Sequence, residues 1–238
     1  MAGKSAGPGR AGHGTAAAAK AKAAARRRAE TRRMRGMLAR EAVLWESGVE
    51  YVAGVDEAGC GPLAGPVVAA AVILPRGLGI RGVNDSKLLP REVRERLALE
   101  IRGQALALGV GAASAAEIDR LNIYHARHLA MKRAVTRLAV TPERILVDGR
   151  PVPCLGEQHE AIVDGDALVH TIACASIIAK TVRDELMRRL AVRYPAYGWD
   201  HNVGYATADH RAAMDRVGLS PHHRRSFLSC QLTLDLGD

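Results

Sequence analysis

The chain has 238 residues, of which 48% are apolar and only 3% aromatic, so it can bury an aliphatic core in one large domain or two small ones. Its longest clean apolar run, 67–74, is far shorter than the ~20 residues that cross a bilayer, and its first residues show no apolar signal sequence. The four cysteines lie far apart, which argues against a disulfide framework or a zinc site and predicts a reducing, cytoplasmic location.

The net charge of +9 is confined to the start of the chain. Residues 1–40 contain 11 Lys and Arg and one acid, whereas the remainder contains 23 basic and 24 acidic residues. Because this segment is low in complexity and cannot bury a core, we expect residues 1–40 to be a disordered basic tail, with a helix conceivable over about 16–40. An arm that binds nucleic-acid phosphates, a solvated extension and a mitochondrial transit peptide are all compatible with this composition.

A folded domain is expected over residues 45–238. Short apolar runs bounded by turn residues predict strands at 51–55, 67–74, 106–113, 144–147 and 161–163. Helical spacing predicts helices at 90–102, 122–138, 174–193 and 207–217. A capping box formed by Ser114 and Glu117 predicts a further short helix that begins there. Strands followed by helices around one sheet predict an α/β domain, with the helices from about residue 195 as a C-terminal appendage.

Acidic residues follow three of the predicted strands. Asp56 and Glu57 follow the first strand, Asp148 follows the fourth, and Asp166 comes shortly after the fifth. Carboxylates at the ends of buried strands are costly unless their charge is offset, and several that converge can hold divalent cations. Two such cations would activate water and stabilise the leaving oxygen in phosphodiester cleavage. Acids at strand ends also act as helix caps and turn formers, so the pattern alone leaves both interpretations open.

A glycine-rich turn, Gly59-Cys60-Gly61, follows the first acid pair at once. Glycines there allow backbone N–H groups to approach a phosphate or a sugar, although a tight turn between two strands also requires them. Further along, Tyr205 precedes the last predicted helix, where it could contact a sugar or equally belong to the core.

The order of these motifs resembles that of prokaryotic ribonuclease HII. The stretch GVDEAGCGPLAGPV at 54–67 is similar to the signature of that family. Further similar stretches follow in the same order: NDSK at 84–87, VDG at 147–149, GD at 165–166, ASIIAK at 175–180, RD at 183–184, GY at 204–205 and HRRSF at 223–227. The resemblance covers roughly residues 50–228.

This resemblance implies a ribonuclease-H-like fold, with a mixed five-stranded sheet flanked by helices, and an endonuclease that requires Mg²⁺ or Mn²⁺ as a two-metal site. Such a monomeric enzyme cleaves 5′ of ribonucleotides in RNA–DNA hybrids and of single ribonucleotides in duplex DNA, leaving 3′-hydroxyl and 5′-phosphate ends. The catalytic and metal-binding residues would be Asp56, Glu57, Asp148 and Asp166. The substrate-binding residues would be Gly59, Cys60, Gly61, Lys87, Ser176 and Tyr205, whereas Lys180 is either a groove residue or structural.

Three positions depart from the family pattern. Cys60 stands where the family usually has arginine, Val203 stands where lysine is common, and Asp164 adds a carboxylate close to Asp166. The loss of two cations predicts weaker phosphate binding near the scissile bond, which the basic tail could offset. A duplex-binding protein of the same fold with weakened or lost catalysis is therefore an alternative function. Ribonuclease HIII is a third hypothesis, although that family carries a folded N-terminal domain that this tail does not resemble.

Overall fold

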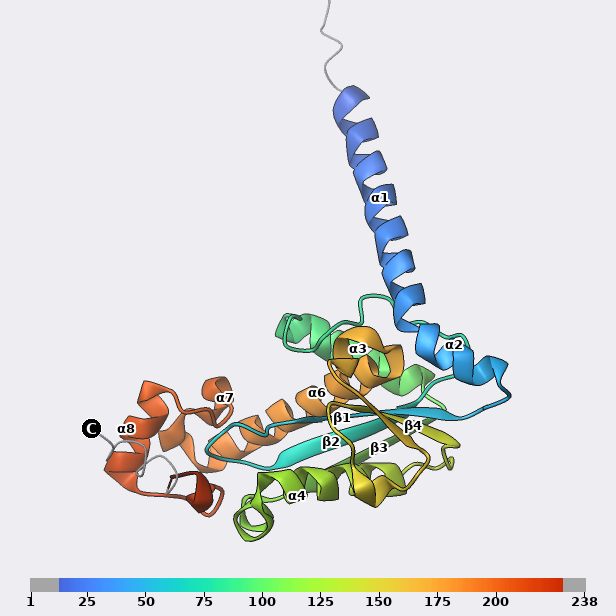
Figure 1. Cartoon of the computed structure of the whole chain (residues 1–238). Coiled ribbons are helices and arrows are strands. Elements are labelled where there is room, and N and C mark those ends of the chain that lie inside the picture. Colours follow the sequence, from blue (N-terminus) through green and yellow to red (C-terminus); the bar gives the residue numbers. More distant parts are fainter. Residues whose placement is uncertain (1–12, 229–238) are drawn as a thin grey trace, which may run out of the picture.

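A mixed five-stranded sheet in the order β3-β2-β1-β4-β5 forms the centre of the computed structural model, which describes residues 13–228 (Figure 1). β1 pairs antiparallel with β2 and parallel with β4, so β1 and β4 end at the same edge of the sheet. The strands are β1 (Val52–Ala58), β2 (Val67–Ile73), β3 (Ala107–Ala113), β4 (Arg144–Asp148) and β5 (His159–Ile162).

Helices cover both faces of this sheet. They are α1 (His13–Met37), α2 (Ala39–Glu46), α3 (Arg91–Gln104), α4 (Ala115–Thr136), α5 (Gly165–Leu168), α6 (His170–Arg193), α7 (Trp199–Asn202) and α8 (Ala208–Val217), with 3-10 turns at Pro153–Leu155 and Pro195–Tyr197. α4 packs on one face, and α6 with α3 on the other (Figure 1). α7 and α8 lie together at one end, as the C-terminal helices that the sequence predicts. The expected fold class, a mixed five-stranded sheet flanked by helices, is confirmed.

β2 is buried along its whole length because helices cover both of its faces. Ala69 and Ala71 pack in the cluster that includes α4, whereas Ala70 and Val72 pack in the cluster that includes α6. This alternation is the two-residue period of a strand, with apolar side chains on both sides. The buried strand predicted over 67–74 is therefore present, and it holds the adjacent β1 in a fixed position.

The entry to α4 follows the predicted capping box. The Ser114 hydroxyl accepts the N–H of Glu117, and the Glu117 carboxylate accepts the N–H of Ser114 at 2.9 Å. Asn122 then interrupts the helix with a φ of 63°. This kink separates the two helices that the sequence predicts for this stretch, one from Ser114 and one from residue 122.

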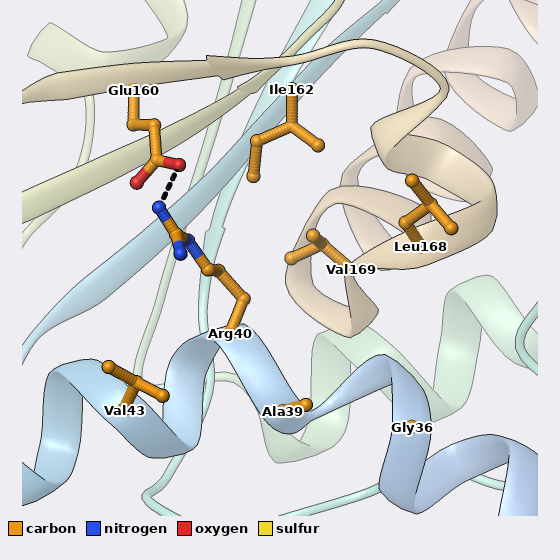
Figure 2. Close-up of a pocket in the computed structure, with 8 residues that line it drawn as sticks. All are labelled: Gly36, Ala39, Arg40, Val43, Glu160, Ile162, Leu168 and Val169. Carbon is orange, nitrogen blue, oxygen red and sulfur yellow. Dashed lines mark hydrogen bonds and ion pairs between the residues drawn. The ribbon is translucent and has the colours of Figure 1, made fainter.

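Burial begins inside the segment that was expected to be a tail. Met37 is only 4% exposed, and the fully buried Glu41 accepts hydrogen bonds from the N–H and the hydroxyl of Thr171 at 2.9 and 3.0 Å. Figure 2 shows Arg40 of α2 directed at Glu160 of β5, with which it forms an ion pair. The packed body therefore extends N-terminally of residue 45 and includes the last turn of α1, whereas the N-terminal turns of α1 project away from it (Figure 1). Of the helices in residues 13–228, none combines the length and apolar character that crossing a bilayer needs.

Candidate active site

A cavity of about 260 Å³ lies where the parallel strands β1 and β4 reach the same edge of the sheet. Asp56 and Glu57 of β1 and Asp148 of β4 line it. The predicted substrate-binding residues line it as well: Gly59, Cys60, Gly61, Lys87, Ser176 and Tyr205. The fold thus brings together residues that lie far apart in the sequence.

Asp166 is the one predicted site residue outside this lining, and it lies directly beside it. It belongs to the short helix α5, and its backbone N–H donates to Oδ1 of Asp148 at 3.3 Å. Asp164, the other acid of this turn, is exposed and has a left-handed backbone with a φ of 55°. The structure therefore places Asp166, rather than Asp164, next to the Asp148 carboxylate of β4.

The carboxylates of this site are buried, as for Asp56 and Asp166, or partly buried, as for Glu57 and Asp148. Asp56 is only 4% exposed, and burial together with the charges of Glu57 and Asp148 raises its pKa well above its usual value. Burial also raises the pKa of Glu57, against the opposing effect of the Arg127 guanidinium. Burial and the charge of Asp148 raise the pKa of Asp166. The site therefore attracts cations, because a cation would relieve both the repulsion and the cost of burial.

Two side-chain cations partly balance these charges. Nζ of Lys87 lies 3.6 Å from Oδ2 of Asp166, and Nε of Arg127 lies 3.3 Å from Oε1 of Glu57. Within residues 13–228, Oε2 of Glu57 is buried without a hydrogen-bond partner. Sequence reasoning missed Arg127, since it lies inside α4 and belongs to no motif.

This donor set fits a hard divalent cation. All of the converging acidic groups offer oxygen ligands, which suit Mg²⁺ and Mn²⁺ rather than zinc, and Oε2 of Glu57 has no other partner among the residues described. No three acidic, histidine or cysteine side chains of residues 13–228 stand close enough to enclose an ion by themselves. Lys87 and Arg127 hold two of the carboxylates, and Mg²⁺ commonly keeps several waters among its ligands.

The glycine turn has one polar side chain, the thiol of Cys60. Burial and the adjacent Glu57 carboxylate raise the pKa of this thiol to about 12, so it stays protonated and donates to Oε1 of Glu57 at 3.4 Å. Gly59 has a φ of 95°, and a Cβ at this position would overlap the Arg183 side chain. Only glycine fits there, because an L side chain would meet both the strained backbone and this steric conflict.

Two buried arginines fix the loop around this turn. Arg183 donates to backbone carbonyls of Ala64, Pro66 and Val203 at 3.0 to 3.2 Å. Arg224 donates to carbonyls of the glycine turn itself. Both arginines lie in stretches that resemble the family, but their sequence surroundings do not mark them as supports of the turn.

The remaining predicted contacts lie around the rim of the cavity. Tyr205 is 46% exposed, with its ring facing Gly61. The Ser176 hydroxyl is hydrogen-bonded to that of Ser86 at 2.8 Å. Lys180 lines the cavity, but its Nζ lies 2.7 Å from Oδ1 of Asp184, so it also has a structural ion pair.

The profile of the Ribonuclease HII family matches residues 53–230. The chain belongs to this family. Ribonuclease HII of Thiobacillus denitrificans is 54% identical over 199 residues, which cover 84% of this chain and 98% of the relative. Ribonuclease HII of Anaeromyxobacter sp. strain Fw109-5 is 52% identical over 208 residues, covering 87% of this chain but only 66% of the relative.

Solved structures of ribonucleases show the same fold. Ribonuclease H2 from Pyrococcus horikoshii has a TM-score of 0.63 and 27% identity, with 74% of this chain and 93% of that chain covered. Ribonuclease HII of Archaeoglobus fulgidus, solved in complex with PCNA, has a TM-score of 0.62 and 29% identity over 74% of this chain and 94% of that chain. A Bst-RNase HIII in complex with Mn²⁺ shares the fold at a TM-score of 0.61 and 22% identity, covering 80% of this chain and 71% of that chain.

As a ribonuclease HII, the protein is a hydrolase of the endonuclease class. The family profile and the identity to ribonucleases HII set aside the ribonuclease HIII hypothesis.

Proposed function

We propose that this ribonuclease HII is a two-metal endonuclease that cleaves 5′ of ribonucleotides, both in RNA–DNA hybrids and at single ribonucleotides in duplex DNA, and leaves 3′-hydroxyl and 5′-phosphate ends. The observation that carries the proposal is the convergence of Asp56, Glu57 and Asp148 in a cavity whose rim is formed by the glycine turn and Tyr205. A hydrolytic centre and a surface for a sugar thereby lie side by side.

The carboxylates of Asp56, Glu57, Asp148 and Asp166 would hold Mg²⁺ or Mn²⁺, which supply Lewis acidity for the attacking water and the leaving oxygen when bound. Asp56 and Asp148 directly follow the last parallel pair of β1 and β4, Val55 with Val147, so the sheet fixes their separation. The thiol of Cys60 and the guanidinium of Arg127 both contact Oε1 of Glu57 and orient this carboxylate.

Substrate recognition would depend on groups that do not read bases. Backbone N–H groups of the glycine turn can bond the 2′-hydroxyl, the group that distinguishes RNA from DNA at one nucleotide. Tyr205 is exposed beside Gly61, where its ring can stack on the ribose. Lys87 is 78% exposed at the rim and can contact a phosphate, so binding would be independent of sequence.

The test is cleavage of three end-labelled duplexes in Mg²⁺ and, separately, in Mn²⁺. One duplex contains a single embedded ribonucleotide, one is an RNA–DNA hybrid, and one is all DNA. We expect incision 5′ of the single ribonucleotide and along the hybrid, but none in the all-DNA duplex. Binding of the ribonucleotide duplex without incision would overturn the proposal and favour a duplex-binding protein of the same fold.

Cys60→Arg is expected to lower KM about threefold to tenfold for the duplex with one ribonucleotide, because a guanidinium adds charge-assisted hydrogen bonds to a phosphate. Steady-state kinetics at fixed ionic strength measure this change. Cys60→Ser is the control, since it retains a small donor next to Glu57 without adding a cation. An unchanged or higher KM in Cys60→Arg would show that the turn has no need of this cation.

Removal of residues 1–29 is expected to weaken duplex binding and flatten its salt dependence, because this basic segment includes the N-terminal turns of α1, which project away from the packed body (Figure 1). The slope of log Kd against log salt concentration should fall by about 0.9 for each phosphate that the tail neutralises in the full-length protein. The deletion stops before Arg33, which donates to the side chain of Asn84 and the carbonyl of Val83, and before Met34, which lies against Gly79, so the melting temperature is expected to stay unchanged. Parallel salt plots for the two proteins would show that the tail does not bind nucleic acid.

A further inference from the structure

Arg224 is a fully buried cation whose whole side chain is directed at the loop after β1. Its Nη2 donates to the carbonyl of Gly59 at 2.6 Å, its Nη1 to that of Cys60 at 2.8 Å and its Nε to that of Gly65 at 3.0 Å. Its backbone N–H also donates to the carbonyl of Leu63 at 2.8 Å. Both the side chain and the main chain of Arg224 therefore hold this loop.

Two of these carbonyls belong to the peptide units that carry the N–H groups of Cys60 and Gly61. The described chain contains no cis peptide bond, and a trans unit directs its C=O and N–H to opposite sides. Because both carbonyls face Arg224, both N–H groups face away from it, and the residues that carry them, Cys60 and Gly61, line the cavity. Neither N–H meets a protein acceptor within residues 13–228.

The backbone of the turn combines a positive φ at Gly59 with a negative φ at the next residue. Gly59 has a left-handed φ of 95°, and Cys60 is not in the left-handed region. A turn with a left-handed residue can direct successive N–H groups into a concavity that binds anions and other lone pairs. The turn therefore offers a pair of donors, and its conformation depends on the carbonyls that Arg224 holds.

The charge of Arg224 acts on these peptide units as well. Its side-chain hydrogen bonds within the described residues all go to carbonyl oxygens rather than to a carboxylate. The ring of Phe227 lies 5.1 Å from the guanidinium carbon and covers its face. A hydrogen bond from a cation to a peptide carbonyl polarises the unit and strengthens its N–H as a donor.

We propose that Arg224 is a positioning residue for ribose recognition, which holds two peptide units so that the N–H groups of Cys60 and Gly61 face the cavity as a pair of polarised donors for the 2′-hydroxyl. This inference rests on the proposed function, because it assigns the support of the turn that would read the ribose. It explains why a cation that bonds carbonyls rather than a carboxylate is buried directly behind the site.

The experiment compares binding of two labelled duplexes of equal sequence, one with a single ribonucleotide and one all DNA, by fluorescence anisotropy in EDTA. The full-length Asp148→Asn protein serves as the parent, so that nothing is cut. The readout is the preference, the ratio of the two Kd values. Arg224→Lys retains the charge but loses the planar fork, and we expect the preference to fall about tenfold, as for the loss of one good hydrogen bond.

Tyr197→Phe is the matched control in the same C-terminal region. It removes the partly buried hydrogen bond from the Tyr197 hydroxyl to the carbonyl of Gly218, which does not involve the turn. We expect its preference to equal that of the parent, although its melting temperature falls. An equal loss of preference in both variants would show a general loosening of the region and overturn the role of Arg224.

The outcomes separate the inference from the function beneath it. If the Asp148→Asn parent binds both duplexes equally well, the turn does not recognise the ribose. That result would overturn this part of the proposed function and the inference together. A parent preference that survives Arg224→Lys would overturn the inference alone. If Arg224→Lys does not fold, Phe227→Leu removes only the ring that covers the guanidinium, and we expect about a threefold loss of preference. An unchanged preference in that variant would count against the role of Arg224.

Discussion

Asp148→Asn is expected to reduce cleavage at least about 10³-fold while it stabilises the metal-free protein by about 1 kcal/mol. Asp148 is among the charges that raise the pKa of the buried Asp56, so a neutral amide of the same shape removes repulsion from the site. The same change removes a carboxylate that the proposed catalysis requires. Initial rates on the duplex with one ribonucleotide, and thermal unfolding in EDTA, measure the two effects.

Asp164→Asn is the control for this variant. Asp164 is exposed, does not line the cavity and has a left-handed backbone that asparagine tolerates well. We expect its cleavage rate to match that of the unmodified enzyme. Cleavage by Asp148→Asn within tenfold of the unmodified rate would contradict the proposed site.

Gly54→Ala is expected to lower the free energy of unfolding by about 3 kcal/mol or more. A Cβ on Gly54 would overlap the backbone of Thr171 and Ile172, so β1 and α6 would have to separate. Backbone atoms cannot rotate away as a flexible side chain can. A decrease of about 6–12 °C in melting temperature should accompany the change.

Gly103→Ala is the comparison, because this glycine lies in α3 and a Cβ there would meet nothing within 4 Å. We expect it to stabilise the protein by up to about 1 kcal/mol, since alanine loses less conformational freedom in a helix. Similar melting temperatures for the two variants would show that β1 and α6 can separate at little cost. That result would contradict the close packing of this strand and helix.

Several features of the fold could be predicted because their causes are local. The capping box at Ser114 and Glu117 depends on residues three positions apart, and it is present. The apolar run at 67–74 predicted a strand buried on both faces, and β2 is that strand. Local cues were less successful at the start of α6, where the sequence predicts a helix from residue 174 and the structure begins it at His170. The additional turn packs against β1 at Gly54, a contact between distant segments.

The sequence alone determined the elements and the acidic residues that follow them, because periodicity, caps and turn residues act over a few positions. The motif order further indicated a family, to which the chain belongs. Only the tertiary structure decided which strands are neighbours, and the parallel pairing of β1 with β4 is what brings Asp56 toward Asp148. It also revealed Arg127 beside Glu57 and Arg224 behind the glycine turn. The sequence does not reveal these roles, because the partners of both arginines lie far away in the chain and meet them only when the protein folds.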